Sequence, residues 1–300
     1  MKVFLTGATG YIGFNVALRL RSAGHEVWGL VRSQSKMNLL KQNEIHTVFG
    51  EMKNPDSYRK IAEEASLIIH CAVDYTKGHE SMDKLTVNTI LEAGKKGPQP
   101  KTFIYTSGVW DYGSSNGLID ETTPMNPVKN IAWRPGVVKS VLNSKDVKGL
   151  VIHSGDVFGK SGGLTGTWFS GASNNDLKVI GDGNNRWPMI HVDDLADAYF
   201  RLSESGLSGE DFNIADRSRY TVREIVEAIA KVSGYSGKIK YIPLEEARRD
   251  MGDYAPALAL DQHVDARKAV RMLGWQPKFN GMVDEIETYY EAWKAYNNLK

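Results

Sequence analysis

A glycine-rich segment, Thr6–Gly13, constrains the fold of this chain more than any other part of the sequence. Its residues, TGATGYIG, directly follow an apolar run and precede an amphipathic stretch. Gly7 permits a tight turn, Gly10 lets the backbone approach a phosphate, and Gly13 lets a helix pack closely on the preceding strand. The amino end of that helix favours a pyrophosphate. A strand–turn–helix unit without a ligand is the alternative, but the context predicts a dinucleotide site whose first contacts are Gly7, Thr9, Gly10, Tyr11 and Ile12.

Short apolar runs and helix-period segments alternate through the first half of the chain. The predicted strands are Lys2–Leu5, Glu26–Val31, Ile45–Phe49, Leu67–His70, Thr102–Thr106 and Leu150–His153. The amphipathic segments between them include Tyr11–Ser22, Pro55–Glu64 and Met82–Lys96. Strands that alternate with helices form a parallel sheet covered on both faces. With right-handed crossovers, this pattern predicts an α/β fold with a doubly wound parallel sheet, a Rossmann domain over residues 1–158.

The pattern changes after Phe158. Four glycines fall within Lys160–Gly171, so we expect a loop there. The rest predicts a smaller mixed α/β substrate lobe over residues 159–300, with some segments returning to the main sheet. Thr221 and Glu224 form a capping-box pattern at the start of one helix. The expected helices are Asp193–Glu204, Thr221–Ser233, Asp265–Leu273 and Met282–Tyr296, and the expected strands are Lys178–Ile180, Asp211–Ile214 and Lys238–Ile242.

The end of the second predicted strand favours one nicotinamide cofactor over the other. A cofactor with a free ribose 2′-hydroxyl usually meets an Asp or Glu at this position. Here Arg32 occupies it, and Ser33 and Lys36 follow. A guanidinium forks onto a phosphate, and an ammonium adds charge. The segment therefore predicts NADP(H), unless Arg32 and Lys36 are only solvated loop charges.

Charge and cysteine content limit the partners and the compartment. The chain carries 37 Lys and Arg against 36 Asp and Glu, so neither a nucleic acid nor a membrane surface is an expected partner. Its single cysteine excludes an intrachain disulfide and is typical of a reducing, cytoplasmic compartment. No apolar run reaches the ~18 residues of a membrane span, and the opening strand leaves no room for a targeting peptide. No His or Cys cluster has metal-ligand spacing, so we expect a small-molecule substrate and no metal.

Four motifs together carry a family resemblance. They are Thr6–Gly13, His70-Cys71-Ala72, Thr106-Ser107 and a second-half motif that runs from Gly181-Asp182-Gly183 to Ile190-His191-Val192-Asp193-Asp194-Leu195-Ala196. With them the chain resembles the extended short-chain dehydrogenase/reductase superfamily, and in particular its NAD-dependent epimerase/dehydratase-like members. The resemblance implies that Cys71 is a packed residue in the cofactor wall and not a nucleophile. It also implies further cofactor contacts from Glu51, Met52, Cys71, Ala72, Val73 and Thr106.

The superfamily's reaction depends on a Tyr-x-x-x-Lys pair, and this chain lacks the tyrosine. The lysine lowers the tyrosine pKa from ~10, so that the tyrosine exchanges a proton with a carbonyl oxygen while hydride moves. Residues 127–139, where the pair should fall, contain no tyrosine. If Arg134 takes the lysine position, Asn130 takes the tyrosine position. If Lys139 takes the lysine position, Pro135 takes the tyrosine position. The distance to the next strand favours the first register.

Four residues are candidates for the chemistry: Ser107, Tyr112, Arg134 and Lys139. The resemblance implies that Ser107, at the end of the fifth strand, faces the nicotinamide and donates to a developing oxyanion; a turn serine is the alternative. Tyr112 would donate the proton or line the pocket, and water is another donor. Arg134 or Lys139 would hold the nicotinamide ribose. Arg134 stays charged at every accessible pH, so it would orient a ligand but not relay a proton.

A second departure from the superfamily concerns the substrate. Its nucleotide-sugar enzymes carry an arginine five residues before the valine of the Ile-His-Val motif, and here that position is Trp187. This difference argues against a sugar nucleotide. Trp168, Phe169 and Trp187 would either line an apolar pocket or belong to the core of the small lobe.

These observations predict an NADPH-dependent oxidoreductase with a non-standard proton donor. It would transfer hydride to a carbonyl or a polarised double bond of a small organic molecule. Two alternatives stay open: a non-catalytic NADP(H)-binding sensor or scaffold, and an epimerase or dehydratase with tightly bound cofactor. Monomer and homodimer also both stay open, because a helix that often forms the superfamily's dimer contact contains Pro135-Gly136 here.

Overall fold

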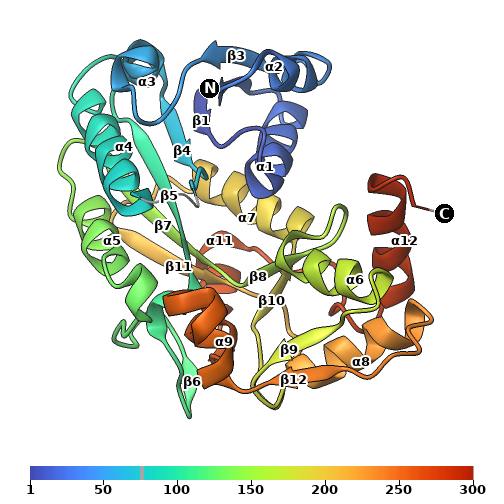
Figure 1. The fold of residues 1–300 in the computed structure, drawn as a ribbon. Helices are drawn as coiled ribbons and strands as arrows, with labels where there is room; N and C mark the ends of the chain where they lie inside the picture. The colour runs from blue at the N-terminus through green and yellow to red at the C-terminus, as the bar shows by residue number, and fades with distance from the viewer. Residues whose placement is uncertain (75–77, 300) are drawn as a thin grey trace.

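The computed structural model describes residues 1–74 and 78–299, and a parallel sheet of seven strands lies at its centre (Figure 1). The strands are β1 (Lys2–Thr6), β2 (Glu26–Val31), β3 (His46–Phe49), β4 (Leu67–His70), β5 (Thr102–Gly108), β7 (Lys148–Ser154) and β11 (Glu210–Ile214). Their order across the sheet is β11-β7-β5-β4-β1-β2-β3. β1 thus has β2 on one side and β4 on the other, which is the switch point of a doubly wound sheet. The predicted fold class is confirmed.

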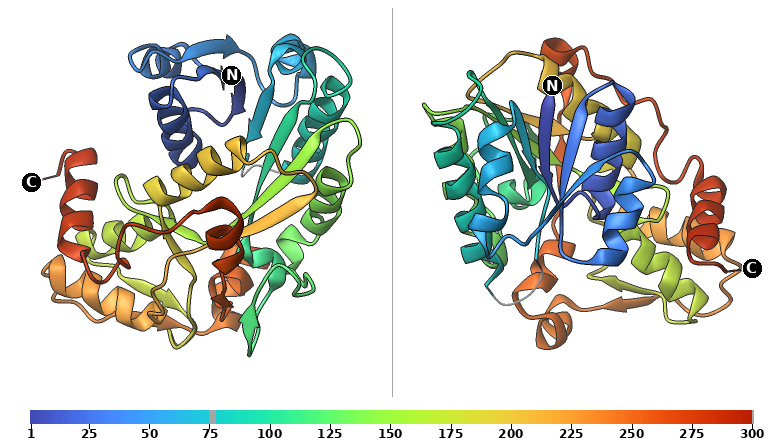
Figure 2. Two further views of the ribbon diagram at one scale, coloured as in Figure 1. Left: turned by 180° about the vertical axis from the view of Figure 1, so that it is seen from behind. Right: turned by 90° about the horizontal axis from the view of Figure 1, so that it is seen from above.

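Helices cover both faces of this sheet (Figures 1 and 2). Those on one face are α1 (Tyr11–Ser22), α2 (Gln34–Lys41), α7 (Val192–Glu204) and α11 (Arg267–Leu273). Those on the other face are α3 (Arg59–Glu64), α4 (His79–Ala93) and α5 (Arg134–Leu142). The central strands are therefore buried on both sides, and Val3, Phe4 and Leu5 expose none of their surface. Double burial explains why these strands are continuous apolar runs instead of alternating ones.

The second half of the chain builds a smaller lobe beside the carboxyl edge of the sheet (Figure 1). Its short strands form three pairs: β8 (Asp156–Phe158) with β10 (Met189–His191), β9 (Lys178–Ile180) with β12 (Lys240–Ile242), and β13 (His263–Val264) with β6 (Leu118–Ile119), which comes from the first half of the chain. Its helices are α6 (Gly166–Ser173), α8 (Val222–Val232), α9 (Leu244–Met251), α10 (Ala255–Leu258) and α12 (Ile286–Tyr296). One segment of this half, β11, returns to the main sheet and pairs with β7.

Short 3-10 helices complete the connections. They are η1 (Pro55–Ser57), η2 (Val109–Tyr112), η3 (Lys129–Ile131), η4 (Gly163–Thr165) and η5 (Gly252–Tyr254). Two of them matter for the site, because η2 follows β5 and η3 precedes α5. The Trp110 ring of η2 lies 5.9 Å from the Tyr254 ring of η5, so these turns meet beyond the end of β5.

The expected loop over Lys160–Gly171 is wrong, because this stretch contains η4 and the start of α6. Gly162 and Gly163 have the positive φ angles of 106° and 53° that a loop residue needs, but the chain then turns helical. Trp168 and Phe169 drive this change, since α6 buries both in the core of the small lobe. Glycine content is a local signal, and tertiary packing overrides it here.

Other boundaries follow the sequence closely. β2, β4, β9 and α1 have the predicted limits, whereas α4 begins three residues early at His79 and α12 begins at Ile286. The capping box is confirmed, since Thr221 Oγ1 accepts from the Glu224 amide at 3.2 Å and Glu224 accepts from the Thr221 amide at 2.7 Å. Within residues 1–74 and 78–299, every helix is too short or too polar to cross a bilayer.

Candidate functional site

The β1–α1 turn leaves no room for side chains at its glycines. Gly7 has a φ of +75°, and a Cβ there would lie 2.7 Å from the Ala72 nitrogen. A Cβ on Gly13 would lie 2.2 Å from the Gly7 oxygen. The Gly10 amide donates to that same oxygen at 2.9 Å, which closes the turn. Close packing against the residues after β4 explains the glycine at position 7, and close packing within the turn itself explains the glycine at position 13.

The amino end of α1 is prepared for an anion. Gly10 caps the helix without a side-chain hydrogen bond, and the first turn carries no acidic residue. The first amides of a helix have no partner within it, and they carry partial positive charge. A pyrophosphate fits this cradle, so the residues present suit a dinucleotide.

The predicted cofactor residues come together along one edge of the sheet. Because β3, β2, β1, β4 and β5 are parallel neighbours, their carboxyl ends meet at this edge. At these strand ends and in the first turn of α1 lie Gly7, Thr9, Gly10, Tyr11, Ile12, Arg32, Ser33, Lys36, Glu51, Met52, Cys71, Ala72, Val73 and Thr106. With the adenosine half towards β2 and β3, the nicotinamide half of a dinucleotide would extend towards β5 and β7.

Arg32 at the end of β2 already has a carboxylate partner. Its Nη1 lies 3.1 Å from Asp74 Oδ2, while its side chain is 69% exposed. Ser33 and Lys36 are exposed beside it. A phosphate arriving here would meet three polar donors but would also share Arg32 with Asp74.

Cys71 is held in an unreactive environment. Thr106 Oγ1 donates to its Sγ at 3.2 Å, and Thr106 also lies 2.6 Å from the Tyr199 hydroxyl. Burial raises the pKa of the Cys71 thiol to about 11. The thiolate is the nucleophilic form, so this environment fits a packed wall residue. Tyr11 is similarly fixed, because its hydroxyl donates to the Gly159 carbonyl at 2.6 Å.

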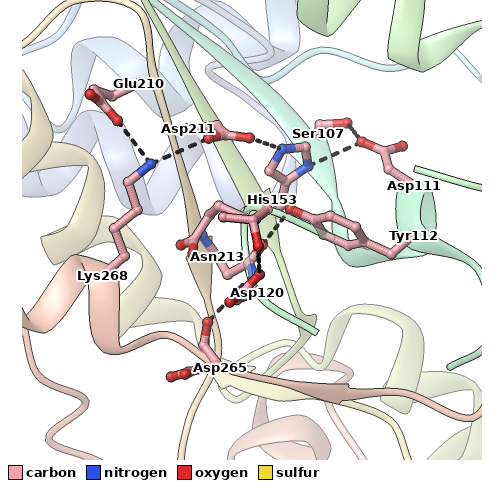
Figure 3. Close-up of polar contacts among 12 residues, drawn as sticks. Ser107, Asp111, Tyr112, Asp120, His153, Glu210, Asp211, Asn213, Asp265 and Lys268 are labelled. Atoms are coloured by element: carbon pink, nitrogen blue, oxygen red, sulfur yellow. Dashed lines mark hydrogen bonds and ion pairs between the residues drawn. The ribbon is translucent and has the colours of Figure 1, made fainter. Parts of the chain in front are cut away.

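Ser107 opens a chain of buried polar contacts (Figure 3). Its hydroxyl donates to Asp111 Oδ2, and the same oxygen lies 3.1 Å from His153 Nδ1. The other ring nitrogen, Nε2, lies 3.2 Å from Asp211 Oδ2, and Lys268 lies 3.4 Å beyond. Ser107 is 3% exposed, and its proton is committed to Asp111. This geometry does not fit the expected role of Ser107 as a donor to substrate, and it favours a structural role.

His153 carries a buried positive charge in this network. It is 0% exposed between two carboxylates. Burial alone would lower its pKa, but the hydrogen bonds and charges of Asp111 and Asp211 outweigh burial and raise the pKa to about 9. His153 therefore neutralises carboxylates beneath the end of β5, and no signal in the sequence paired these three residues.

Tyr112 is equally committed to the fold. Its hydroxyl donates to Asn213 Oδ1 at 2.9 Å, and the side chain is 3% exposed. Burial, and then the nearby charges of Asp211 and Glu121, raise its pKa well above the ordinary tyrosine range. A buried phenol of this kind is a poor exchanger of protons near pH 7.

The two registers proposed for the lysine position differ in their surroundings. Arg134 is the first residue of α5, with its guanidinium 5.4 Å from the Trp133 ring. Asn130, four residues earlier in η3, has a buried Oδ1 with no hydrogen-bond partner in the described part of the chain. Lys139 is exposed in the middle of α5. The Asn130–Arg134 register therefore includes a buried polar atom, whereas Lys139 of the other register is exposed.

Asp156 is a candidate that sequence reasoning missed. It follows Gly155 as the first residue of β8, so it lies just beyond the carboxyl end of β7. Its Oδ2 is buried and has no hydrogen-bond partner among the described residues. Burial raises the pKa of this carboxyl to about 7, against a smaller lowering by the Trp110 side chain. A lone Asp in an apolar strand was the available signal, since a carboxylate there needs a reason.

Trp187 fills space where the resemblance would put an arginine. Its ring stacks on Trp168 at 4.8 Å, and its Nε1 donates to the Leu258 carbonyl at 3.3 Å. Trp187 is 4% exposed, and Phe169 belongs to the same buried cluster. All three aromatic residues therefore belong to the core of the small lobe.

Comparison with known proteins agrees with this architecture. An uncharacterised protein of Saccharomyces cerevisiae is 25% identical to this chain, and the match covers 97% of this chain and 99% of the yeast protein. The probable UDP-arabinose 4-epimerase 3 of Arabidopsis thaliana is 24% identical, with 97% of this chain and 80% of its own covered.

Solved structures show the same fold at lower identity. The dTDP-glucose 4,6-dehydratase of Bacillus anthracis, in complex with NAD, has a TM-score of 0.83 at 21% identity, covering 99% of this chain and 97% of its own. The UDP-glucose 4-epimerase of Thermotoga maritima, with UDP-glucose, has a TM-score of 0.83 at 20% identity. The match covers 99% of this chain and 100% of the epimerase chain. Residues 3–215 match the profile of one family, and the chain belongs to it: the NAD dependent epimerase/dehydratase family.

Proposed function

We propose that this protein is an NADPH-dependent oxidoreductase that reduces a carbonyl or a polarised double bond of a small organic substrate, with Asp156 as the proton donor. The carrying observation is the Asp156 carboxyl just beyond the end of β7, whose Oδ2 is buried and has no hydrogen-bond partner among the described residues. In the register that we favour, Asn130 stands where the family's tyrosine is expected; in the other register, Pro135 does. A carboxyl that stays protonated near neutral pH replaces the missing acid.

The contacts of the individual residues suggest a separate role for each of them in this reaction. The bound dinucleotide supplies the hydride. Asp156 gives its proton to the substrate oxygen as negative charge develops there, and regains a proton from solvent after product leaves. Arg134 orients the ribose or the substrate through its fixed charge. The buried network below Ser107 holds the ends of β5 and β7 in register, which places Asp156.

The substrate proposed here is not a sugar nucleotide. A diphosphate needs cationic partners, whereas the Trp187 position presents an indole stacked in the core. The Leu258 carbonyl, which accepts from that indole, adds a negative dipole at the same place.

Incubation with NADPH and a panel of aldehydes, ketones and enones tests the proposal directly. We expect loss of NADPH absorbance with at least one member, with a matching amount of reduced product. Binding of NADPH without turnover over the whole panel would contradict the proposal and favour a non-catalytic sensor or scaffold.

An epimerase or dehydratase is the second candidate, and the names of the relatives favour it. Such an enzyme must return the hydride to the same substrate, so it keeps its cofactor through each cycle. We expect the purified protein to release no nicotinamide dinucleotide on denaturation after extended dialysis. A stoichiometric amount of released NAD, together with conversion of a UDP-sugar, would support the epimerase instead.

The NADP preference is testable at Arg32. Arg32→Glu is expected to weaken NADPH binding about 10-fold or more, because a charge-assisted hydrogen bond is worth about 1.5–3 kcal/mol. NADH binding should change by less than a few-fold, as its ribose carries no phosphate. Dissociation constants from fluorescence titration measure both effects.

Two further variants control this experiment. Arg32→Gln removes the charge without placing a second carboxylate beside Asp74. Arg21→Glu changes an exposed arginine on α1 whose partner is Glu44, away from the strand ends. Equal losses for NADPH and NADH in both Arg32 variants would remove the NADP assignment.

A further inference from the structure

A cavity of about 460 Å³ lies between the loop after β11, β13 and α11. Its walls include none of the residues assigned above to the dinucleotide or to proton transfer. α11, which contributes part of the cavity wall, lies at the back of Figure 1 and comes to the front in the reverse view of Figure 2. The cavity is thus a separate site, not an extension of the cofactor edge.

Arginine side chains dominate the polar lining. Four of them, Arg186, Arg217, Arg219 and Arg267, face two carboxylates, Asp216 and Asp265. They come from three separate parts of the chain, so the fold and not a local charge run gathers them. The cavity therefore holds more positive than negative side-chain charge.

The pairing of these groups leaves two arginines without a carboxylate. Arg267 Nη2 lies 2.6 Å from Asp265 Oδ2, so this pair neutralises itself. Arg186 lies 3.7 Å from Asp261, just outside the lining. Arg217 contacts only the neutral Gln276 at 3.4 Å, and Arg219 has no hydrogen bond or ion pair in the described part of the chain. Arg217 and Arg219 are the cations available to a ligand.

His263 reports the resulting electrostatic potential. Burial lowers its pKa, and the charges of Arg219 and Arg186 lower it further; Asp261 and Asp265 oppose this shift but do not cancel it. The arginines thus outweigh the carboxylates at the cavity wall. An anion bound beside Arg219 would offset their effect and raise the pKa of His263.

Arg186 and Trp187 both lie in the lining of this cavity but make different contacts. The Trp187 ring also stacks on Trp168 in the core of the small lobe. Arg186 lies beside Asp261, and its backbone is bridged to Thr221. The cavity therefore has an arginine next to the position where the resemblance implies one.

We propose that this cavity is a second binding site, for a phosphorylated small molecule. Two guanidinium groups without carboxylate partners match the forked geometry and the double charge of a phosphate. Val270, Pro188 and Pro277 add an apolar wall for the organic part of the ligand. The volume lies within the ~300–1,000 Å³ range of small-molecule sites. The proposal does not depend on the reaction proposed above.

Calorimetric titration with a simple sugar phosphate, at low salt, tests this site. We expect saturable binding of the sugar phosphate, weakened at least 10-fold in the Arg217→Ala/Arg219→Ala double variant. Arg271→Ala is the matched control, because Arg271 is exposed on α11 and does not line the cavity. The affinity of this variant for sugar phosphate should stay within two-fold of the native value. Arg32→Gln should leave sugar phosphate binding unchanged.

The His263 imidazole provides a readout in the unmodified protein. Its proton NMR signal, identified by its loss in His263→Gln, should titrate at higher pH when sugar phosphate is bound. Absence of saturable binding at millimolar ligand would overturn the proposal. So would binding that persists in the Arg217→Ala/Arg219→Ala variant, or a His263 titration unaffected by ligand, since either result places the ligand elsewhere.

Discussion

Asp156→Asn is expected to lower kcat for NADPH-dependent reduction by about 10²–10³-fold, the usual contribution of a positioned acid. Asparagine keeps the shape of the side chain but has no acidic proton. The proposed cofactor contacts lie at the glycine turn and at the ends of β2 to β5 and do not include Asp156, so the dissociation constant of NADPH should stay within a few-fold. Steady-state kinetics with the best substrate of the panel, together with NADPH titration, measure the two effects separately.

The pH dependence of the reduction rate is a second test of Asp156 as the proton donor. Burial raises the pKa of Asp156 to about 7, so the donor is protonated below that pH and ionised above it. The rate of the native enzyme should therefore fall about tenfold per pH unit above pH 7. Asp156→Asn should lose this descending limb, while Asp156→Glu should retain it with reduced kcat.

An exposed carboxylate provides the matched control for Asp156. Asp182 lies in the turn after β9 and accepts from the Asn184 amide at 2.9 Å. Asp182→Asn should leave both kcat and the pH profile unchanged. An Asp156→Asn enzyme with native kcat, or with the descending limb intact, would assign the proton to another group.

His153→Gln is expected to destabilise the protein by about 3 kcal/mol or more. Breaking a buried ion pair leaves an uncompensated charge, which typically costs about 3–5 kcal/mol. Asp111 is the carboxylate left behind, since it is 0% exposed and keeps only the Ser107 hydroxyl. Asp211 retains Lys268 at 3.4 Å. Chemical denaturation of the native and variant proteins at pH 7 measures the loss.

Stability should also depend on pH through this histidine. Its pKa is raised from 6.5 to about 9, so the folded protein holds a proton that the unfolded chain releases between these values. The stabilisation is complete below pH 6.5 and disappears as pH rises through 9, a change of up to about 3 kcal/mol. His153→Gln should abolish this slope.

Two variants separate the ion pair from a general loss of packing. In Asp111→Asn/His153→Gln the buried charge is gone, so this protein should be more stable than His153→Gln alone. His46→Gln removes an exposed histidine on β3 and should cost less than about 1 kcal/mol. A double variant no more stable than His153→Gln would contradict the proposed coupling.

Sequence patterns predicted the glycine turn and the surrounding parallel strands well, because the requirements of these elements are local. Gly7 and Gly13 lie where a Cβ would strike the backbone, so the spacing of glycines in the chain reflects contacts within one turn. Parallel strands then bring the ends of β2 and β4 to the same edge without further information. The roles expected for Ser107 and Tyr112 had no such local basis. Their hydroxyl partners include Asn213, which lies 101 residues from Tyr112.

By itself, the sequence determined a doubly wound sheet with a glycine-rich first turn, and it led to the predictions of a phosphate site at that turn and of a missing family tyrosine. Only the tertiary structure decided that Asp156 is shielded, that His153 bridges two carboxylates, and that arginines from three segments meet in one cavity. The physical reason is the separation, along the chain, of the residues that interact. Backbone geometry and hydrophobic periodicity act between near neighbours in the chain, whereas burial and charge depend on which distant segments pack together.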